Sequence, residues 1–458
     1  MRQYVPLVMG LSFFMETLDL KMITTVIPTI SKSLNVSPIH LKYVLIAYFI
    51  GLMSFVSIGA WVSKRVGATR TFFIGICFFM VGTLTAGVTI NIYTLVFSRF
   101  IQGVGGALMG PIARSMMLKH SPSSMHATLM SYYTIPAAVG SMLGPVVAGA
   151  VVTFVSWRCV FFINLPISIL VLWMAKKTFP KDEGKQIHSF DFKGFILLNA
   201  FILLLLILLE SLDVFWMHTM YMIALIIAVI GVLAMFLYYL TTMKNSLFDV
   251  NLIYDQSFLP LCCAGLIFSI AISASTFLMP LFFQLGLGFS PLSSGTLLMA
   301  FGVGVVLGRV INPKGIDALG VKFWSLLNAF LGVLSFWGLS QMNQQAYGPL
   351  VLLLYVQGQV AAILITNIAI MMFKNTPSHL ITQASGVYEL QKRLGAVIGV
   401  SLAGFVFGVV QSMLDVRTFS SITVYHQLFK GVAILVVCAM LFLLSYRQSD
   451  RTSLNELK

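Results

Sequence analysis

Long apolar stretches, each about the length of a membrane-crossing helix, recur along the whole chain. A helix rises 1.5 Å per residue, so about 20 apolar residues cross the roughly 30 Å hydrocarbon core of a bilayer. We identify 14 such stretches, and their connections are too short to hold a soluble domain. They lie near residues 5–28, 41–62, 71–90, 93–117, 129–153, 160–179, 192–210, 217–241, 258–284, 292–311, 321–340, 347–373, 384–411 and 428–446. The pattern predicts an all-α polytopic membrane protein with 14 transmembrane helices.

The basic residues follow the alternation that such helices impose on their loops. With the N-terminus in the cytoplasm, 18 of the 28 Lys and Arg residues fall in cytoplasmic segments, 5 in outer loops and 5 inside helices. Cytoplasmic loops of membrane proteins carry an excess of Lys and Arg. We therefore predict a multi-pass membrane protein with both termini in the cytoplasm and an even number of spans. We expect it in a bacterial inner membrane.

Composition excludes several classes of protein. With 59% hydrophobic and 9% charged residues, the 458-residue chain is unlike a soluble enzyme or a disordered protein. The net charge of +14 is spread over single residues and pairs, so it does not indicate nucleic-acid binding. The sequence holds no phosphate-binding loop, and its 7 His and 5 Cys form no metal or disulfide motif. We expect no cofactor, no metal and no ATP-driven pumping.

Two cytoplasmic turns resemble each other and point to an internal repeat. Residues 60–70 and 313–322 each place a charged residue three positions before a glycine and a cation two or three positions after it. A short basic turn can also be a topology signal alone. Here, however, the turns occupy the same place in two blocks of six helices, as in transporters built from two related halves. The candidate conformational residues of these turns are Lys64, Arg65, Gly67, Asp317 and Gly320.

The repeat predicts how the chain is organised. Residues 1–180 form an N-terminal six-helix half, and residues 251–446 form a C-terminal six-helix half. Residues 181–250 insert two further helices between the halves, and residues 447–458 form a cytoplasmic tail. The two inserted helices lack internal charge, so we expect them at the periphery.

Charged residues in the first and fourth apolar stretches are the first candidates for function. Asp19 and Glu16 lie mid-helix, where an ionised carboxylate costs on the order of 3 kcal/mol or more. Burial disfavours the ionised carboxylate and a nearby cation favours it, so a carboxyl that meets both in turn can load and release a proton. The alternative is a static ion pair of Asp19 with Lys21 or Arg99. Lys21 either neutralises Asp19 or favours an anionic substrate.

Small residues mark the fourth and fifth stretches. Gln102 stands among closely spaced glycines, which let a neighbouring helix approach. In the fifth stretch the candidates for a conformational role are Gly140, Gly144, Pro145 and Gly149. Small residues favour tight helix crossing, and proline allows a kink. These residues thus predict either plain helix packing or a hinge or seal for alternating access.

The thirteenth stretch carries a second group of charges. Glu389 and Arg393 are four residues apart and share one helix face, with Lys392 beside them. We interpret the group first as an internal ion pair and second as a substrate contact.

Several of these segments together resemble the fourteen-helix drug:proton antiporters of the major facilitator superfamily, the EmrB/QacA-type exporters. The similar segments are Leu18-Asp19 with residues 26–30, the R-x-x-Q-G-x-G-x-A pattern at 99–107, the glycine-rich residues 140–149, and the W-R-x-x-F-x-I-N-x-P block at 157–166. The resemblance implies a major facilitator fold and a role for Arg99 in proton translocation. Lys21 and Glu389 depart from the residues usual in that family.

These observations predict a secondary transporter that exports hydrophobic or amphiphilic small molecules, such as drugs, in exchange for protons. A small-molecule substrate, protons and the lipid bilayer are its expected partners, with a periplasmic adaptor protein as a further candidate. Export of a specific metabolite or siderophore is the alternative, as is a transporter-like sensor that does not transport. A membrane enzyme would need clustered catalytic groups at one membrane face, and the sequence has none.

Overall fold

The computed structural model describes residues 5–119, 126–179, 191–211, 219–242, 258–344, 346–374, 376, 380–414 and 421–446. Within these ranges every regular element is a helix, and no strand occurs among them. This confirms the predicted all-α class. The expected tail, residues 447–458, lies outside the described residues, as do the loop lysines Lys181 and Lys185.

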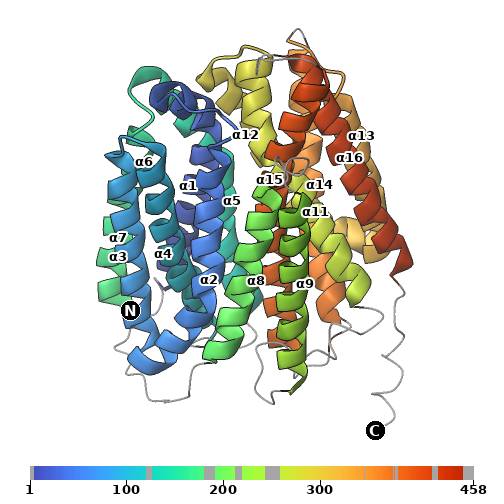
Figure 1. Ribbon diagram of the computed structural model, residues 1–458. Coiled ribbons are helices and arrows are strands. Elements are labelled where there is room, and N and C mark those ends of the chain that lie inside the picture. Colours follow the sequence, from blue (N-terminus) through green and yellow to red (C-terminus); the bar gives the residue numbers. More distant parts are fainter. Residues whose placement is uncertain are drawn as a thin grey trace. The chain divides into compact units, whose positions relative to one another are not determined.

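The helices divide between two compact units, of which unit 1 comprises residues 1–190 and 279–302. Its helices, blue to green-teal in Figure 1, follow in chain order. They are α1 (Val5–Leu34), α2 (Lys42–Val66), α3 (Ala68–Gly87), α4 (Ile92–Lys119), α5 (His126–Phe154), α6 (Cys159–Phe162) and α7 (Asn164–Thr178). The stretch 279–302 adds the end of α11 (Leu259–Leu281), the π-helix η4 (Phe282–Gly286) and the first part of α12 (Pro291–Leu319).

Close backbone contacts hold the helices of unit 1 together. Within the unit, α1 packs along α5, and α4 packs against both α2 and α3. At Gly105 of α4, an added Cβ would lie 2.5 Å from the backbone nitrogen of Phe79 on α3, and at Gly103 it would collide with the carbonyl of Tyr48 on α2. Only glycine permits these approaches, which confirms the packing role inferred for the glycines after Gln102.

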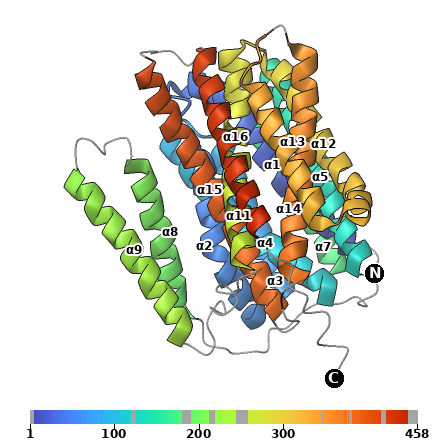
Figure 2. The same ribbon diagram turned by 90° about the vertical axis from the view of Figure 1, so that its right-hand side faces the viewer.

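Unit 2 comprises residues 191–278 and 303–458. Its helices are α8 (Phe192–Glu210), α9 (Thr219–Thr242), most of α11, the rest of α12, α13 (Val321–Leu339), α14 (Tyr347–Lys374), α15 (Ile381–Met413) and α16 (Ile422–Ser445). Within it, α13 packs on α14 and α16, whereas α9 packs on α8 and α8 on α15. Figure 2 shows α8 and α9 as a hairpin at the edge of this unit. Their insertion between two six-helix halves stays a prediction.

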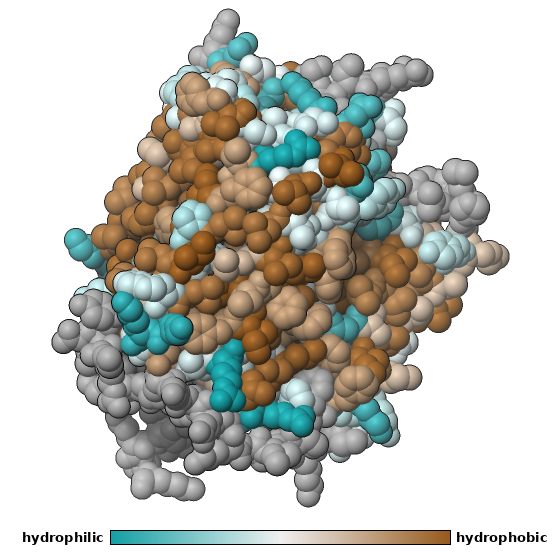
Figure 3. Space-filling model, turned by 90° about the vertical axis from the view of Figure 1, so that its left-hand side faces the viewer, coloured by the Kyte–Doolittle hydropathy of each residue, from teal (hydrophilic) through white to brown (hydrophobic). Residues whose placement is uncertain are grey.

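Twelve helices of the described residues are long and apolar enough to cross a membrane. Neither α1 nor α2 is among them, because charged residues such as Asp19 and Lys21 interrupt α1, and the described apolar stretch of α2, Lys42–Val56, is shorter. The count of 14 spans stays a prediction. Apolar side chains also point outward, such as Phe78 on α3 and Trp337 on α13. Figure 3 shows one face that is mostly brown, with hydrophilic residues gathered towards its upper and lower parts.

Helix ends are where the structure differs from the sequence prediction. Helix α1 continues to Leu34 and α12 to Leu319, each beyond the apolar stretch. Residues 60–66 and 313–319 of the two predicted turns are helical, so each turn is confined to its glycine, Gly67 or Gly320. The helical hydrogen bonds of α12 continue until Gly320, whose positive φ of 76° ends them. The sixth predicted helix is divided into α6 and α7 at Ile163, and α11 ends in the π-helix η4.

Candidate functional site

A buried ion pair joins α1 to α4 inside unit 1. Asp19 is 1% exposed and Arg99 is 0% exposed. The Nη1 group of Arg99 donates to Asp19 Oδ2 at 2.5 Å and to Gln102 Oε1 at 2.6 Å. Two opposite charges at this distance offset much of each other's desolvation cost, which an isolated charge inside a protein would bear in full. Three residues proposed separately from the sequence therefore lie together.

Side chains from further helices extend this pair. Asn164, the first residue of α7, donates to Asp19 Oδ1 at 2.8 Å. Gln102 Nε2 donates to Thr83 Oγ1 on α3 at 2.7 Å. The guanidinium of Arg99 also lies 4.6 Å from the ring centroid of Tyr48 on α2, within range of a cation–π contact. We call this group the Asp19–Arg99 network; its members are Asp19, Tyr48, Thr83, Arg99, Gln102 and Asn164.

Sequence reasoning missed three members of the network. Asn164 lies inside the W-R-x-x-F-x-I-N-x-P block. The available sequence signal was a polar amide two residues before a proline within an apolar stretch. Thr83 and Tyr48 gave no signal, because hydroxyl and aromatic residues are common throughout the apolar stretches. Arg158 of the same block has a structural role, since its Nη2 donates to the Thr89 carbonyl at 3.0 Å.

The network retains hydrogen-bonding capacity. Arg99 uses only Nη1, and among the described atoms its Nε and Nη2 groups have no hydrogen-bond partner. The Oδ1 atom of Asn164 is buried without one as well. Buried donors and acceptors are usually paired, and exceptions concentrate where a structure rearranges or reacts. Because these two donor groups are unused, Arg99 is able to form new hydrogen bonds without leaving its site.

Glu16 and Lys21 lie on α1 but outside this network. Glu16 is 5% exposed, and its Oε2 atom would be 3.4 Å from a Cβ placed on Gly110 of α4. Lys21 Nζ lies 5.3 Å from the ring centroid of Phe301 on α12. No ion pair of Lys21 occurs within the described part of the chain, because Asp19 is paired with Arg99. The predicted alternative that Lys21 neutralises Asp19 is therefore wrong for this structure.

The glycine-rich face of α5 contacts two neighbouring segments of unit 1. A Cβ at Gly140 would meet the Phe14 carbonyl at 2.7 Å, and one at Gly144 would meet the Lys21 Cβ at 2.8 Å, both on α1. Towards the other end of α5, a Cβ at Gly149 would lie 2.5 Å from the Pro291 carbonyl of α12. Pro145 lies between these contacts and faces Gly295. The four residues thus form one smooth surface between α1 and the start of α12.

The two turns singled out in the sequence share one backbone conformation. Gly67 has φ 99° and ψ 146°, and Gly320 has φ 76° and ψ 151°. Each glycine amide donates to the carbonyl four residues earlier, and each glycine carbonyl accepts from the amide four residues later. Lys64, Arg65 and Asp317 are exposed near the ends of α2 and α12. The shared geometry supports the internal repeat inferred from the residue pattern.

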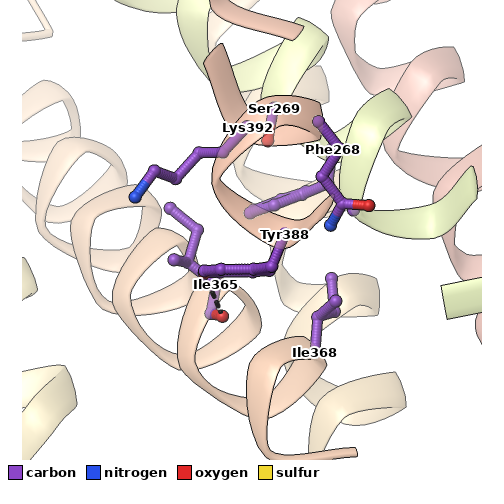
Figure 4. Close-up of a pocket in the computed structure, with 8 residues that line it drawn as sticks. Phe268, Ser269, Ile365, Ile368, Tyr388 and Lys392 are labelled. Carbon is purple, nitrogen blue, oxygen red and sulfur yellow. Dashed lines mark hydrogen bonds between the residues drawn. The ribbon is translucent and has the colours of Figure 1, made fainter. Parts of the chain in front are cut away.

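On α15 the three charged residues pair with one another. Arg393 Nε lies 3.6 Å from the Glu389 carboxylate, the pair that the spacing predicted, and Lys392 Nζ lies 3.0 Å from the same carboxylate. All three are partly exposed, in contrast to the buried pair of unit 1. Next to them, α11, α14 and α15 line a small pocket (Figure 4). The Tyr388 ring lies against Ile365 there, and the Tyr388 hydroxyl donates to the Ile365 carbonyl at 2.9 Å.

Comparisons with known proteins agree with the fold. A protein named multidrug resistance protein MdtD from Pectobacterium atrosepticum is 28% identical over 447 residues, covering 95% of this chain and 94% of that protein. Its namesake from Klebsiella pneumoniae is 27% identical, covering 95% and 93%.

Solved structures of transporters share the fold at low sequence identity. The nucleoside transporter NupG superposes with a TM-score of 0.65 at 14% identity, covering 97% of this chain and 100% of that one. The peptide transporter POT in complex with sulfate gives a TM-score of 0.68 at 15% identity, covering 96% and 94%. The family description of the Major Facilitator Superfamily matches residues 9–400. The chain therefore belongs to the Major Facilitator Superfamily of membrane transporters.

Proposed function

We propose that this transporter exports hydrophobic or amphiphilic small molecules from a bacterial cell in exchange for protons. The observation that carries the proposal is the buried ion pair of Asp19 and Arg99, held among apolar helices by neutral hydrogen-bonding residues. Ionisable residues within membrane-spanning segments are costly and usually mark ion or substrate pathways. The names of the relatives, multidrug resistance proteins of similar length, support this choice of substrate class.

Protonation of Asp19 provides a simple coupling step. While Asp19 is ionised, it connects α1 with α4 through Arg99 and with α7 through Asn164. A proton on Asp19 removes the negative charge and weakens its attraction to Arg99. Arg99 keeps the Gln102 oxygen and the Tyr48 ring as partners, so its own charge stays stabilised on α4. The proton thus acts mainly on the link between α1 and the other helices.

The α5 surface is suited to pass on a movement of α1. Gly140 and Gly144 lie against α1, and Gly149 lies against the start of α12. Because all three contacts involve backbone or Cβ atoms, small displacements of α1 alter the packing of the whole surface. We assign these residues and Pro145 to the conformational change of alternating access, in which one half of the molecule rocks against the other.

The distribution of basic residues supports the membrane orientation that the sequence predicts. We place the protein in the inner membrane with both termini in the cytoplasm, because cytoplasmic segments hold 18 of the 28 Lys and Arg residues. Transport and not catalysis is the proposed activity.

Efflux measurements with and without a proton uncoupler test the proposal. Cells that express the wild type or Asp19→Asn are loaded with a fluorescent amphiphile, and its loss is followed in time. We expect the uncoupler to abolish wild-type efflux and Asp19→Asn to lower it at least tenfold. Asp191→Asn is the matched control, since Asp191 caps α8 and accepts a hydrogen bond from Tyr239 within unit 2, whereas the network belongs to unit 1. Efflux that neither treatment changes would exclude proton coupling through Asp19.

A further inference from the structure

Lys21 is a half-buried cation in the middle of α1, and it has no acidic partner in the described part of the chain. Its nearest carboxylate in sequence, Asp19, is two residues away and accepts hydrogen bonds from Arg99 and Asn164. Residues two apart on a helix point to different sides. Among the described residues, no negative charge therefore pairs with the positive charge of Lys21.

The side chain of Lys21 is directed towards protein and not towards a membrane surface. Lysines near helix ends reach the lipid headgroups, but Lys21 lies midway along the 30 residues of α1. Its Cβ is in close contact with Gly144 of α5, and its Nζ is over the Phe301 ring of α12. The ammonium thus lies where residues 279–302 adjoin α1 within unit 1.

The segment 279–302, which contacts Lys21 through Phe301, also carries polar groups that lie against α1. Gln284 of the π-helix η4 donates to the carbonyl of Thr25, one helical turn from Lys21, at 2.8 Å. Its Nε2 also reaches Ser294 Oγ at 3.4 Å. Short π-helical segments inside longer helices are frequent at functional sites. Lysine, amide, hydroxyl and the Phe301 ring together provide one positive charge, neutral hydrogen-bonding groups and an apolar surface.

We propose that Lys21 binds the acidic group of the exported molecule, so that the substrate is an organic anion with an apolar body. The proposal rests on the export function given above and narrows its substrate class. A carboxylate or sulfonate near Nζ would supply the missing negative charge, and the apolar body would lie against residues such as Phe301. A cationic substrate would meet an uncompensated positive charge at this place, while the neighbouring Asp19 is already occupied by Arg99.

Transport of two permanently charged fluorescent probes tests the proposal. Proteoliposomes with an imposed proton gradient are given anilinonaphthalene sulfonate, an amphiphilic anion, or ethidium, an amphiphilic cation. The proteins compared are the wild type, Lys21→Gln, Lys21→Arg and the control Lys193→Gln, an exposed lysine at the start of α8. The quantity measured is the ratio of sulfonate transport to ethidium transport.

We expect the wild type to prefer the sulfonate and Lys21→Gln to lower the ratio at least tenfold. Lys21→Arg keeps the charge and the Cβ contact with Gly144, so its ratio is expected to stay within threefold of wild type. Lys193→Gln is expected to leave the ratio unchanged. Size-exclusion profiles of the purified variants establish that each is folded.

Two results would overturn the proposal. If Lys21→Gln lowers transport of both probes equally, Lys21 has a structural role and does not select charge. If the wild type moves ethidium and not the sulfonate, the substrate is not an anion, although proton-driven export stands. A third result would overturn the export function itself: neither probe moves with or without the gradient, and Asp19→Asn has no effect on efflux from cells.

Discussion

Gly67 and Gly320 end two helices in the same backbone conformation, with φ of 99° and 76° and each amide bonded to the carbonyl four residues earlier. One glycine belongs to unit 1 and the other to unit 2, and each begins the next helix directly. Residues other than glycine rarely adopt positive φ because the Cβ meets the backbone. The two turns therefore need glycine for the same reason.

Alanine at either glycine is expected to destabilise the protein by about 1–2 kcal/mol through backbone strain. The measurement is the thermal unfolding midpoint of the purified protein in detergent, for Gly67→Ala and Gly320→Ala. Gly231→Ala is the control, because Gly231 lies inside α9 with a helical φ and open space at its Cβ. Equal midpoints for all three variants would contradict the shared role of the turns.

Removal of both charges of the buried ion pair is expected to cost less than the sum of the two single removals. Asp19→Asn leaves the Arg99 guanidinium buried without a carboxylate, and Arg99→Gln leaves the carboxylate without its cation. Each single change is expected to destabilise the protein by about 3–5 kcal/mol, the usual cost of an uncompensated buried charge.

The double variant Asp19→Asn with Arg99→Gln is expected to regain at least about 1 kcal/mol relative to the sum of the single effects. Unfolding by denaturant, followed by tryptophan fluorescence, supplies the three free energies for the cycle. Strict additivity would mean that the two side chains do not interact in the membrane protein. The cycle measures stability alone, so it is independent of the efflux test of Asp19.

Asn164 is expected to be important to transport because it binds the carboxylate oxygen that Arg99 leaves available. Asn164→Ala removes a hydrogen bond to a charged group, which is worth about 1.5–3 kcal/mol. Efflux of a fluorescent amphiphile is expected to fall at least fivefold. Asn199→Ala is the matched control, since the Asn199 amide bonds only the Phe195 carbonyl of its own helix among the described residues. A similar loss in both variants would assign Asn164 a general packing role.

The ion pair and the repeat could be predicted from sequence for physical reasons. A charge such as Asp19 or Arg99 is conspicuous within an apolar stretch, and only a small number of partners can compensate it. Thr83 and Tyr48 could not be assigned, because their contacts depend on how α2, α3 and α4 are rotated about their axes. Apolar length does not fix that rotation.

Hydropathy also could not predict where the helices end. Apolar length marks the part of a helix that lies in hydrocarbon, whereas hydrogen bonding continues into polar residues until the backbone is forced to turn. In α12 that point is Gly320 and not Pro313, which lies within the helix. The contact of Lys21 could not be predicted either, because Asp19, its nearest acidic residue in sequence, pairs with Arg99, and Phe301 comes from a segment far along the chain.

The α5 surface gives a final prediction, in which the position of a single methyl group decides the effect. A Cβ at Gly149 would lie 2.5 Å from the Pro291 carbonyl, so Gly149→Ala forces α5 away from the start of α12. Gly408→Ala adds the same methyl group to α15 where no atom lies within 4 Å. If α5 and α12 must close tightly during each cycle, Gly149→Ala is expected to lower efflux at least tenfold and Gly408→Ala to leave it unchanged.

The measurement is efflux at matched expression, with the unfolding midpoint determined in parallel. Full transport by Gly149→Ala would exclude a seal at this contact, since the methyl group leaves no room for the packing seen here.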